Sequence, residues 1–270
     1  MAGIESAELE AERLLAHVLE LDRGRLALEL DARLTAEQAG ALARAVGRRL
    51  TREPLQHIEG AVHFRHLCLT SDARALVPRP ETEQLIDCVA GWLAGRRLEV
   101  ALDIGTGTGA IAASLVSEGL AARAVATDVS QPALALATEN FDRLGLADRI
   151  ELRQTSGPIW EPIDEAERFG CIVSNPPYVS EAESLGLAPE VAEFDPREAL
   201  VAGPDGLDVI REIAAGAAPH LEQGGALFVE IGAGQGAAVR RLFEDRPEWR
   251  RVLIQRDLAG LDRFARAEPS

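Results

Sequence analysis

Residues 103–109 read Asp-Ile-Gly-Thr-Gly-Thr-Gly and follow directly from an apolar stretch that starts at Val100. A glycine has no Cβ, so it permits a tight turn and lets a ligand come close to the backbone. This segment predicts the end of a strand, a turn with a binding site, and the start of a helix. Two other interpretations stay open here. Gly105, Gly107 and Ala110 also fit the G-x-G-x-x-A pattern of dinucleotide-binding proteins, and a tight turn can exist without any ligand.

Strands and helices alternate along the chain around this turn. Apolar segments that predict strands lie at residues 100–104, 122–127, 150–152, 171–174, 226–231 and 252–255. Helical patterns lie between most of them, at residues 110–118, 132–144 and 207–220. Such alternation predicts an α/β fold with a mostly parallel sheet that is covered by helices on both faces.

The N-terminal part of the chain has a different character. Leucine and valine recur at helical spacing near residues 9–19, and a second helix is expected at residues 35–50, capped by Thr35. Residues 55–77 suggest short strands or a hairpin, and a helical pattern resumes at residues 81–93. We therefore predict a small N-terminal helical domain at residues 1–75 and a catalytic domain at residues 76–270.

Composition excludes several classes of protein. With 28 basic and 44 acidic residues the net charge is −16, which disfavours direct binding to nucleic acid. The three cysteines form no C-x-x-C pair, so no metal site is indicated, and no stretch approaches the ~20 apolar residues of a membrane span. The acidic start does not resemble a signal peptide. We expect a cytoplasmic, monomeric protein with no membrane partner and no metal.

Asp128 closes the second strand of the α/β part, nineteen residues after Gly109. A carboxylate at that strand end can accept hydrogen bonds from both ribose hydroxyls of an adenosine. Alternatively, Asp128 or Ser130 caps the helix that follows. Together with the glycine-rich turn, Asp128 indicates a cofactor that contains adenosine, without saying which one.

Residues 174–178 read Ser-Asn-Pro-Pro-Tyr and follow another strand, so they emerge at the same edge of the sheet. The prolines fix φ and remove two N–H donors, which leaves a stiff loop with free carbonyls. The side-chain carbonyl of Asn175 and the backbone carbonyl of Pro176 can hold both protons of a planar –NH2 group and aim its nitrogen. Tyr178 can offer an aromatic face or edge to that group. The alternative is an ordinary proline-rich turn.

These motifs together resemble the Rossmann-like, class I methyltransferases that use S-adenosylmethionine, in the branch that methylates planar amide or amine nitrogens. That branch includes adenine-N(6) DNA, guanine-N(2) ribosomal RNA and glutamine-N(5) protein methyltransferases. The resemblance implies a cofactor-binding role for Gly105, Thr106, Gly107, Thr108, Gly109, Asp128 and Asn175. It implies catalytic roles for Asn175, Pro176 and Tyr178, and substrate binding by these three and Pro177.

Further segments resemble the peptide chain release factor glutamine methyltransferases, at residues 54–58, 76–83, 193–196 and 228–232. Related enzymes that act on a ribosomal protein typically have Pro-Arg-Ser-Pro where this chain has Arg79-Pro80-Glu81-Thr82. The resemblance implies methylation of the glutamine in the Gly-Gly-Gln motif of class I release factors, with the N-terminal domain recognising that partner. The alternatives are an adenine-N(6) DNA methyltransferase, a glutamine methyltransferase of a ribosomal protein, and a domain that only binds the cofactor or a partner.

One segment departs from the family pattern. Family members usually carry Gly-Asp after the third strand, where the acid helps to hold adenine, but residues 154–158 here read Gln-Thr-Ser-Gly-Pro. Trp160 follows shortly after, and it either packs on the adenine ring or packs within the protein. The sequence therefore does not predict which residues contact the adenine.

Overall fold

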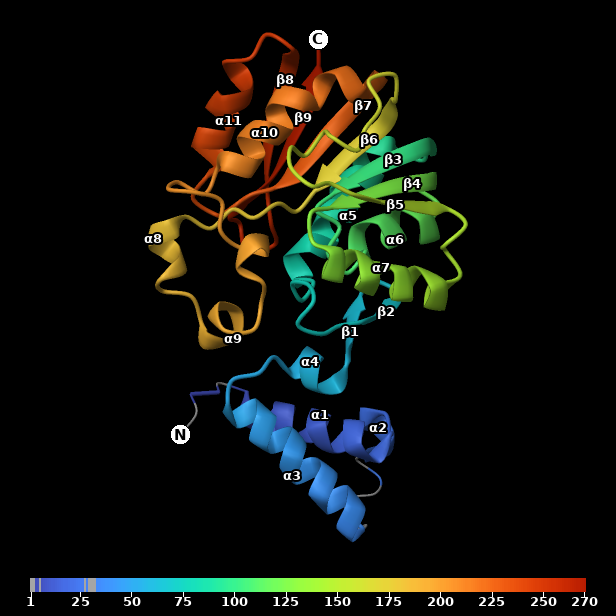
Figure 1. Cartoon of the computed structure of the whole chain (residues 1–270), viewed down its shortest axis with the longest axis vertical. Coiled ribbons are helices and arrows are strands. Elements are labelled where there is room, and N and C mark those ends of the chain that lie inside the picture. Colours follow the sequence, from blue (N-terminus) through green and yellow to red (C-terminus); the bar gives the residue numbers. More distant parts are fainter. Residues whose placement is uncertain (1–2, 5, 27, 29–32) are drawn as a thin grey trace.

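The computed structural model describes residues 3–4, 6–26, 28 and 33–270. Its N-terminal part consists of α1 (Ala7–Leu19), α2 (Arg23–Leu26), α3 (Ala36–Leu50) and α4 (Leu55–Glu59). These helices lie at one end of the molecule, below the α/β part in Figure 1. Helices α1, α3 and α4 share a small core of their own, formed by Leu14, Ala45, Leu55 and Ile58.

The predicted cap of the second helix is confirmed. The Thr35 hydroxyl accepts a hydrogen bond from the Gln38 N–H at 3.2 Å, and the Gln38 side chain accepts one from the Thr35 N–H at 2.9 Å. This reciprocal pair satisfies two N–H groups that the first turn of a helix leaves free. It fixes the start of α3 one residue after Thr35.

In the segment 55–77 the predicted hairpin is confirmed, but the prediction is wrong for residues 55–59. Strands β1 (Ala61–Phe64) and β2 (Leu67–Thr70) pair antiparallel, but residues 55–59 form the short helix α4. Leu55 and Ile58 are spaced as on one helix face and are buried in the N-terminal core. A run this short cannot be assigned by its periodicity, because strands and helices of four or five residues have similar patterns.

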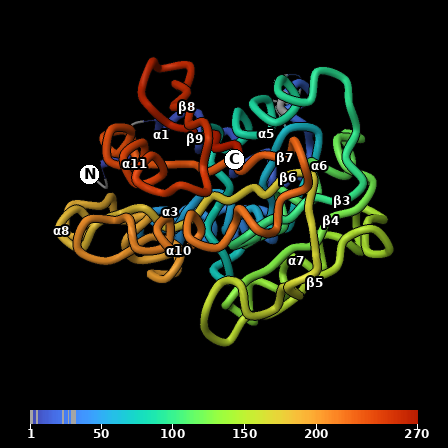
Figure 2. Tube along the Cα trace, turned by 90° about the horizontal axis from the view of Figure 1, so that it is seen from above, coloured from blue at the N-terminus to red at the C-terminus, as the bar shows by residue number. Residues whose placement is uncertain are grey.

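A seven-stranded sheet forms the centre of the α/β part. Its strands are β3 (Leu98–Ile104), β4 (Ala121–Asp128), β5 (Ile150–Gln154), β6 (Phe169–Ser174), β7 (Leu221–Glu230), β8 (Trp249–Arg256) and β9 (Asp262–Pro269). Their order across the sheet is β5-β4-β3-β6-β7-β9-β8, which can be followed in Figure 2. Strands β3 to β7 are parallel, and β9 runs antiparallel between β7 and β8. The predicted mostly parallel sheet is confirmed.

Helices cover both faces of this sheet, and each face has its own apolar core. The longer ones are α5 (Pro80–Leu93), α6 (Ala110–Ser117), α7 (Gln131–Leu144), α10 (Asp208–Gly216) and α11 (Gly236–Glu244). Neighbouring residues of β3 face opposite sides: Ala101 packs with α5, α6 and α7, whereas Leu102 packs with α10 and α11. This alternation is the two-residue period of a strand that is buried on both faces.

The β1–β2 hairpin packs with the α/β part. Val62, Phe64, Leu67 and Leu69 are buried in the same core as Leu85 of α5. The hairpin is therefore a structural part of the larger core, whereas helices α1, α3 and α4 pack around a separate one.

Two further elements differ from the sequence-based expectation. Strand β9 was not predicted, because charged residues alternate through it and only Phe264, Ala265 and Ala267 are buried. The helix expected at residues 207–220 ends at Gly216, and a 3-10 turn, Ala218–His220, follows. Pro219 in that turn has no N–H to continue an α-helix.

Candidate active site

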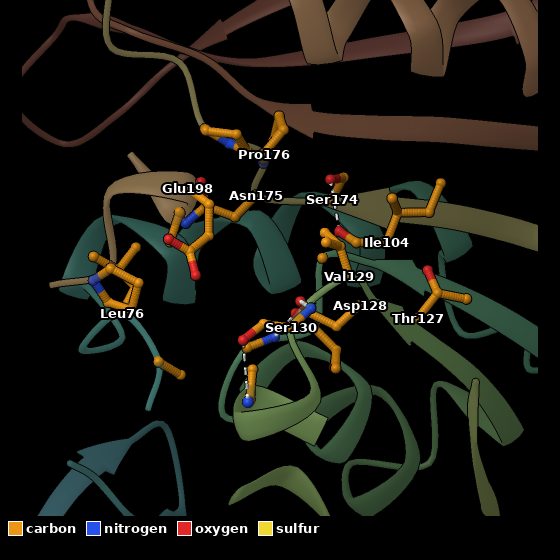
Figure 3. A pocket seen from close by; sticks show the side chains of 18 of the residues that line it. Leu76, Ile104, Thr127, Asp128, Val129, Ser130, Ser174, Asn175, Pro176 and Glu198 are labelled. Carbon is orange, nitrogen blue, oxygen red and sulfur yellow. Dashed lines mark hydrogen bonds between the residues drawn. The ribbon is translucent and has the colours of Figure 1, made fainter. Parts of the chain in front are cut away.

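A cavity of about 300 Å³ opens at the carboxyl ends of β3, β4 and β6. Figure 3 shows Asn175 and Pro176 across this cavity from Asp128 and Ser130. Most of the predicted site residues line it: Gly105, Thr106, Gly107, Thr108, Asp128, Asn175, Pro176 and Pro177. Two predicted site residues, Gly109 and Tyr178, lie outside the lining. The fold thus brings three motifs that are far apart in the sequence to one cavity.

The glycine-rich turn is held by its neighbour β4. The N–H groups of Gly105 and Thr106 both donate to the carbonyl of Thr127 at 2.9 Å. Gly105 has a φ of 72°, and a Cβ placed there would meet no other atom, so the backbone is open at this position. Gly109 has a φ of 84°, and a Cβ there would come within 2.5 Å of Phe141. Gly105 therefore gives access to the backbone, while Gly109 allows α6 to pack closely on α7.

The buried carboxyl group of Asp103 supports the glycine-rich turn. Its Oδ2 atom accepts hydrogen bonds from the Thr106 hydroxyl at 2.7 Å and from the Ala112 N–H at 3.1 Å. The side chain is fully buried, and this burial raises the pKa of Asp103 to about 7. The carboxyl group joins the turn to the first residues of α6. The sequence analysis assigned no role to Asp103.

Asp128 is oriented by backbone N–H groups. One carboxylate oxygen accepts from the Gly107 N–H and the other from the Ser130 N–H, both at 2.9 Å. Burial raises the pKa of the Asp128 carboxyl. A carboxylate has about four lone-pair sites, so each oxygen keeps one for a ligand hydroxyl. The cap of α7 is Ser130, whose hydroxyl faces the Ala133 N–H, so capping is not the role of Asp128.

The Asn-Pro-Pro-Tyr loop is anchored on both sides. Before it, the Ser174 hydroxyl donates to the carbonyl of Ile104 at 2.8 Å, which ties β6 to β3. After it, Val179 forms a short parallel bridge with Val201. The carbonyl of Tyr178 accepts from the Gln235 side chain at 2.9 Å. These contacts fix the backbone of the loop at the rim of the cavity.

The side chain of Asn175 belongs to a hydrogen-bonded series that the sequence analysis missed. Its Nδ2 atom donates to the Thr82 hydroxyl at 3.0 Å, and that hydroxyl donates to Glu230 Oε2 at 2.7 Å. The Tyr178 hydroxyl lies 3.4 Å from Glu230 Oε1 and donates to it. Thr82 and Glu230 stand in the segments at 76–83 and 228–232 that carry the family resemblance, and this was the only signal for them in the sequence.

Glu230 is an unusual residue for a sheet interior, because its side chain is only 1 % exposed. Burial raises the pKa of Glu230 to about 7, although the hydroxyls of Thr82 and Tyr178 and the charge of Arg263 favour its ionised form. A buried carboxyl group with a raised pKa beside a cavity is typical of functional sites.

The loop after β5 forms another wall of the cavity. It contains the position where family members usually carry Gly-Asp and this chain does not. Thr155, Gly157 and Ile159 line the cavity there, together with Val209 and Glu212 of α10. The Ile159 N–H donates to Glu212 Oε1 at 2.6 Å.

Trp160 lies outside this lining. Its ring stacks on His220 at a centroid distance of 5.1 Å and an interplanar angle of 9°. Its indole N–H donates to the carbonyl of Glu212 at 3.1 Å. Of the two roles considered for Trp160, packing within the protein fits the structure and stacking on adenine does not.

The last wall comes from residues 181–199, which include the short helices α8 (Glu181–Ser184) and α9 (Pro189–Ala192). Pro196, Glu198 and Ala199 line the cavity. In Figure 1 these helices lie between the sheet and the N-terminal helices.

Ion pairs hold this segment to the rest of the chain. Asp195 accepts from Arg79 at 2.7 Å, and Glu190 pairs with Arg49 at 3.0 Å and with Arg52 at 2.6 Å. Helix α3 therefore contacts a segment that closes the cavity.

Within the described part of the chain, no group of three or more His, Cys, Asp or Glu side chains could hold a metal ion. None of the helices among the described residues combines the length and the apolar character that crossing a membrane requires.

The chain matches two protein families. Residues 1–60 match the PrmC N-terminal domain, and residues 82–193 match the Methyltransferase small domain. Proteins named release factor glutamine methyltransferase are similar over nearly the full length. The one from Cereibacter sphaeroides is 44% identical, covering 98% of this chain and 92% of its own. The one from Deinococcus radiodurans is 41% identical, covering 98% and 92%.

Solved structures share the fold at low identity. The hMettl16 catalytic domain in complex with an RNA hairpin has a TM-score of 0.59 and 15% identity, over 86% of this chain and 80% of that one. A T. thermophilus 16S rRNA methyltransferase in complex with AdoMet and guanosine has a TM-score of 0.54 and 20% identity, over 78% and 50%.

The fold, the cavity and these matches define a class I methyltransferase with an added N-terminal helical part. Within that class, the identity of 44% over almost the whole chain is decisive. The chain belongs to the release factor glutamine methyltransferase family.

Proposed function

We propose that this methyltransferase transfers the methyl group of S-adenosylmethionine to the side-chain amide nitrogen of the glutamine in the Gly-Gly-Gln motif of bacterial class I release factors. The observation that carries the proposal is the pair of carbonyl acceptors at Asn175 and Pro176, on a rigid loop at the rim of the cavity. The names of relatives that are 36–44% identical support the same substrate.

The residues of the cavity fit an adenosine-containing cofactor. The open backbone at Gly105 admits a ligand, and Asp128 keeps free lone pairs for ribose hydroxyls. Apolar side chains such as Ile159 and Val209 offer a surface for a base. When bound, S-adenosylmethionine supplies an electrophilic methyl group and the sulfur keeps the electron pair of the broken C–S bond. The protein itself supplies binding, orientation and electrostatics.

The substrate amide needs help because its nitrogen lone pair is delocalised into its own carbonyl. The Asn175 side-chain oxygen and the Pro176 carbonyl accept its two N–H protons and aim the nitrogen at the methyl group. Orientation of this kind contributes several kcal/mol, out of the ~7–11 kcal/mol that positioning supplies at best. The nitrogen then forms the new N–C bond, and one amide proton leaves to water. Proline carbonyls suit this role because the loop that presents them cannot relax.

A labelling experiment with matched substrates tests the proposal. Full-length protein is incubated with methyl-labelled S-adenosylmethionine and either an intact class I release factor, the same factor with the motif glutamine changed to alanine, or duplex DNA. We expect label in the intact factor only. Label in the DNA would favour the adenine methyltransferase alternative, although the charge of −16 opposes it. Cofactor binding without transfer to any substrate would favour a domain that only binds.

We also propose that the N-terminal domain recognises the release factor, in a cytoplasmic and monomeric enzyme. Every residue assigned to the chemistry lies after residue 75, whereas Arg49 of α3 pairs with Glu190 in the segment that closes the cavity. A suitable test fragment begins at Ala61, because the β1–β2 hairpin packs in the α/β core. It should bind the cofactor normally and methylate the intact factor at least about 10-fold more slowly, the effect of losing 1.4 kcal/mol of contact energy. An equal rate for fragment and full chain contradicts this role.

A further inference from the structure

Three polar side chains from three distant segments form a single series at the edge of the cavity. Glu230 ends β7, Thr82 lies in the first turn of α5, and Asn175 follows β6. The Thr82 hydroxyl lies 2.7 Å from Glu230 Oε2 and 3.0 Å from Asn175 Nδ2. Thr82 and Glu230 are 3 % and 1 % exposed, so the hydrogen bond between them is shielded from water.

The chemistry of the series determines its direction. An ionised carboxylate can only accept, so Glu230 takes the single hydrogen of the Thr82 hydroxyl. The Thr82 oxygen can then only accept from Asn175, which means that the amino group of Asn175 faces Thr82. The carbonyl oxygen of Asn175 therefore faces away from Thr82. This is the orientation in which it can accept an N–H proton of a substrate amide.

We propose that Thr82 and Glu230 are positioning residues, which fix the side-chain amide of Asn175 in the one orientation that can hold the substrate glutamine. The inference rests on the proposed function for the identity of the substrate. Without the series, the two orientations of an asparagine side chain differ little in energy, and one of them points an amino group at the N–H protons of the substrate. Partners behind a functional residue typically contribute 10–100-fold to activity.

Protonation of Glu230 should make the orientation of the Asn175 side-chain amide less fixed. A carboxylic acid can donate to the Thr82 oxygen, which frees the hydroxyl hydrogen to face the Asn175 oxygen instead. Four groups bear on Glu230: the hydroxyls of Thr82 and Tyr178 and the charge of Arg263 favour its ionised form, and the charge of Glu81 opposes it. Burial dominates and raises the pKa of Glu230 to about 7. The rate of methyl transfer should therefore fall as the pH drops through about 7.

Rate measurements on full-length variants test the proposal. Thr82→Val keeps the shape but removes the hydroxyl, and it should lower the single-turnover rate of methyl transfer to a release factor about 10–100-fold. Cofactor affinity and KM for the factor should stay the same. Thr82→Ser keeps the oxygen and should recover most of the rate. Thr138→Val, on the exposed side of α7, is the matched control and should not differ from wild type. Glu230→Gln cannot ionise, so it should lose the decline of rate below pH 7.

An NMR measurement makes the inference testable without any substrate. The signals of the Asn175 side-chain NH2 group are identified by their loss in Asn175→Asp. They should shift in Thr82→Val and exchange faster with water, because the acceptor is gone, and both effects should be small in Thr82→Ser. Unchanged Asn175 signals in Thr82→Val overturn the inference, as does a wild-type rate for that variant. If wild type transfers no methyl group to the factor while the signals shift as expected, the proposed substrate is wrong and the positioning of Asn175 stands.

Discussion

Two walls of the cavity, the one around Asp128 and the one around Asn175, are built in different ways. The wall around Asp128 is local: Asp103 and Thr106 are three residues apart, and Asp128 and Gly107 are twenty-one apart. The wall around Asn175 depends on distant segments, because Thr82 is 93 residues from Asn175 and 148 from Glu230. The difference indicates that the cofactor wall forms largely within one strand–helix–strand unit (β3, α6 and β4), whereas the amide-holding wall exists only when the whole sheet is assembled.

The walls also differ in the groups that fix them. Backbone N–H groups of Gly107 and Ser130 orient Asp128, and no side-chain substitution removes them. Side chains alone orient Asn175. We therefore expect that changes in the Asn175 wall reduce methyl transfer much more than they reduce cofactor binding.

The largest effect is expected for Asn175→Ala, which deletes one of the two acceptors for the substrate amide. Its single-turnover rate should fall at least ~100-fold, the scale for losing one oriented polar group at a reacting centre. Cofactor affinity should change by only ~1–2 kcal/mol. Asn175→Asp keeps one acceptor, so its rate should lie between those of wild type and Asn175→Ala. Calorimetry and rapid-quench kinetics on the same preparations measure both quantities, and a near wild-type rate for Asn175→Ala would remove this loop from the mechanism.

Asp128→Ala should act mainly on cofactor affinity and less on the rate of methyl transfer, and its effect should be somewhat smaller than that of Asn175→Ala. The ribose hydroxyls of the cofactor lose their acceptor, so affinity should weaken by ~1–3 kcal/mol, measured by calorimetry. Asp142→Ala removes an exposed carboxylate from α7 and controls for the change of net charge. If both variants bind the cofactor as tightly as wild type, Asp128 is not a cofactor ligand.

Gly109→Ala tests the packing behind the cofactor wall. The added Cβ would lie 2.5 Å from Phe141 at a φ of 84°, so overpacking adds to backbone strain. The free energy of unfolding should fall by about 2–4 kcal/mol, from ~1–3 for overpacking and ~1 for the left-handed conformation. Gly145→Ala has a similar φ of 67° and open space around its Cβ, so it isolates the strain and should lose about 1 kcal/mol. Equal losses in chemical denaturation would contradict the contact with Phe141.

The last expected effect is a dependence of stability on pH. In the folded protein the pKa of Asp103 is raised to about 7, so the native state keeps a proton that the unfolded chain releases near pH 4. Wild type should lose stability from about pH 4 to pH 7, by at most ~1.4 kcal/mol per pH unit from this group, and no further above pH 7. Asp103→Asn should lose the part of this decline that Asp103 causes and keep the part that Glu230 causes, since the pKa of Glu230 is also raised to about 7. Denaturation curves without cofactor between pH 4 and pH 8 measure the difference, and parallel profiles would show that Asp103 is ionised in the native state.

The sequence predicted the main residues of the wall around Asp128. For the wall around Asn175 it predicted the loop but not the side chains that support it. The strand ends, the glycine-rich turn, Asp128 and the Asn-Pro-Pro-Tyr loop were readable, because each motif is short and its backbone geometry is dictated locally. Thr82 and Glu230 were not readable as site residues, since only the pairing of β6 with β7 and the docking of α5 bring them to Asn175. Strand β9 was missed for a similar reason, because its position between β7 and β8 is fixed by tertiary pairing and not by its own pattern.

The central claim is that the cavity holds a glutamine side chain by its amide for methyl transfer. Tandem mass spectrometry of a class I release factor, after incubation with the full-length enzyme and S-adenosylmethionine, tests it most directly. We predict one added methyl group on the side-chain nitrogen of the glutamine in the Gly-Gly-Gln motif, present with wild type and nearly absent with Asn175→Ala. A methyl group on another residue, or equal methylation by both proteins, would contradict it.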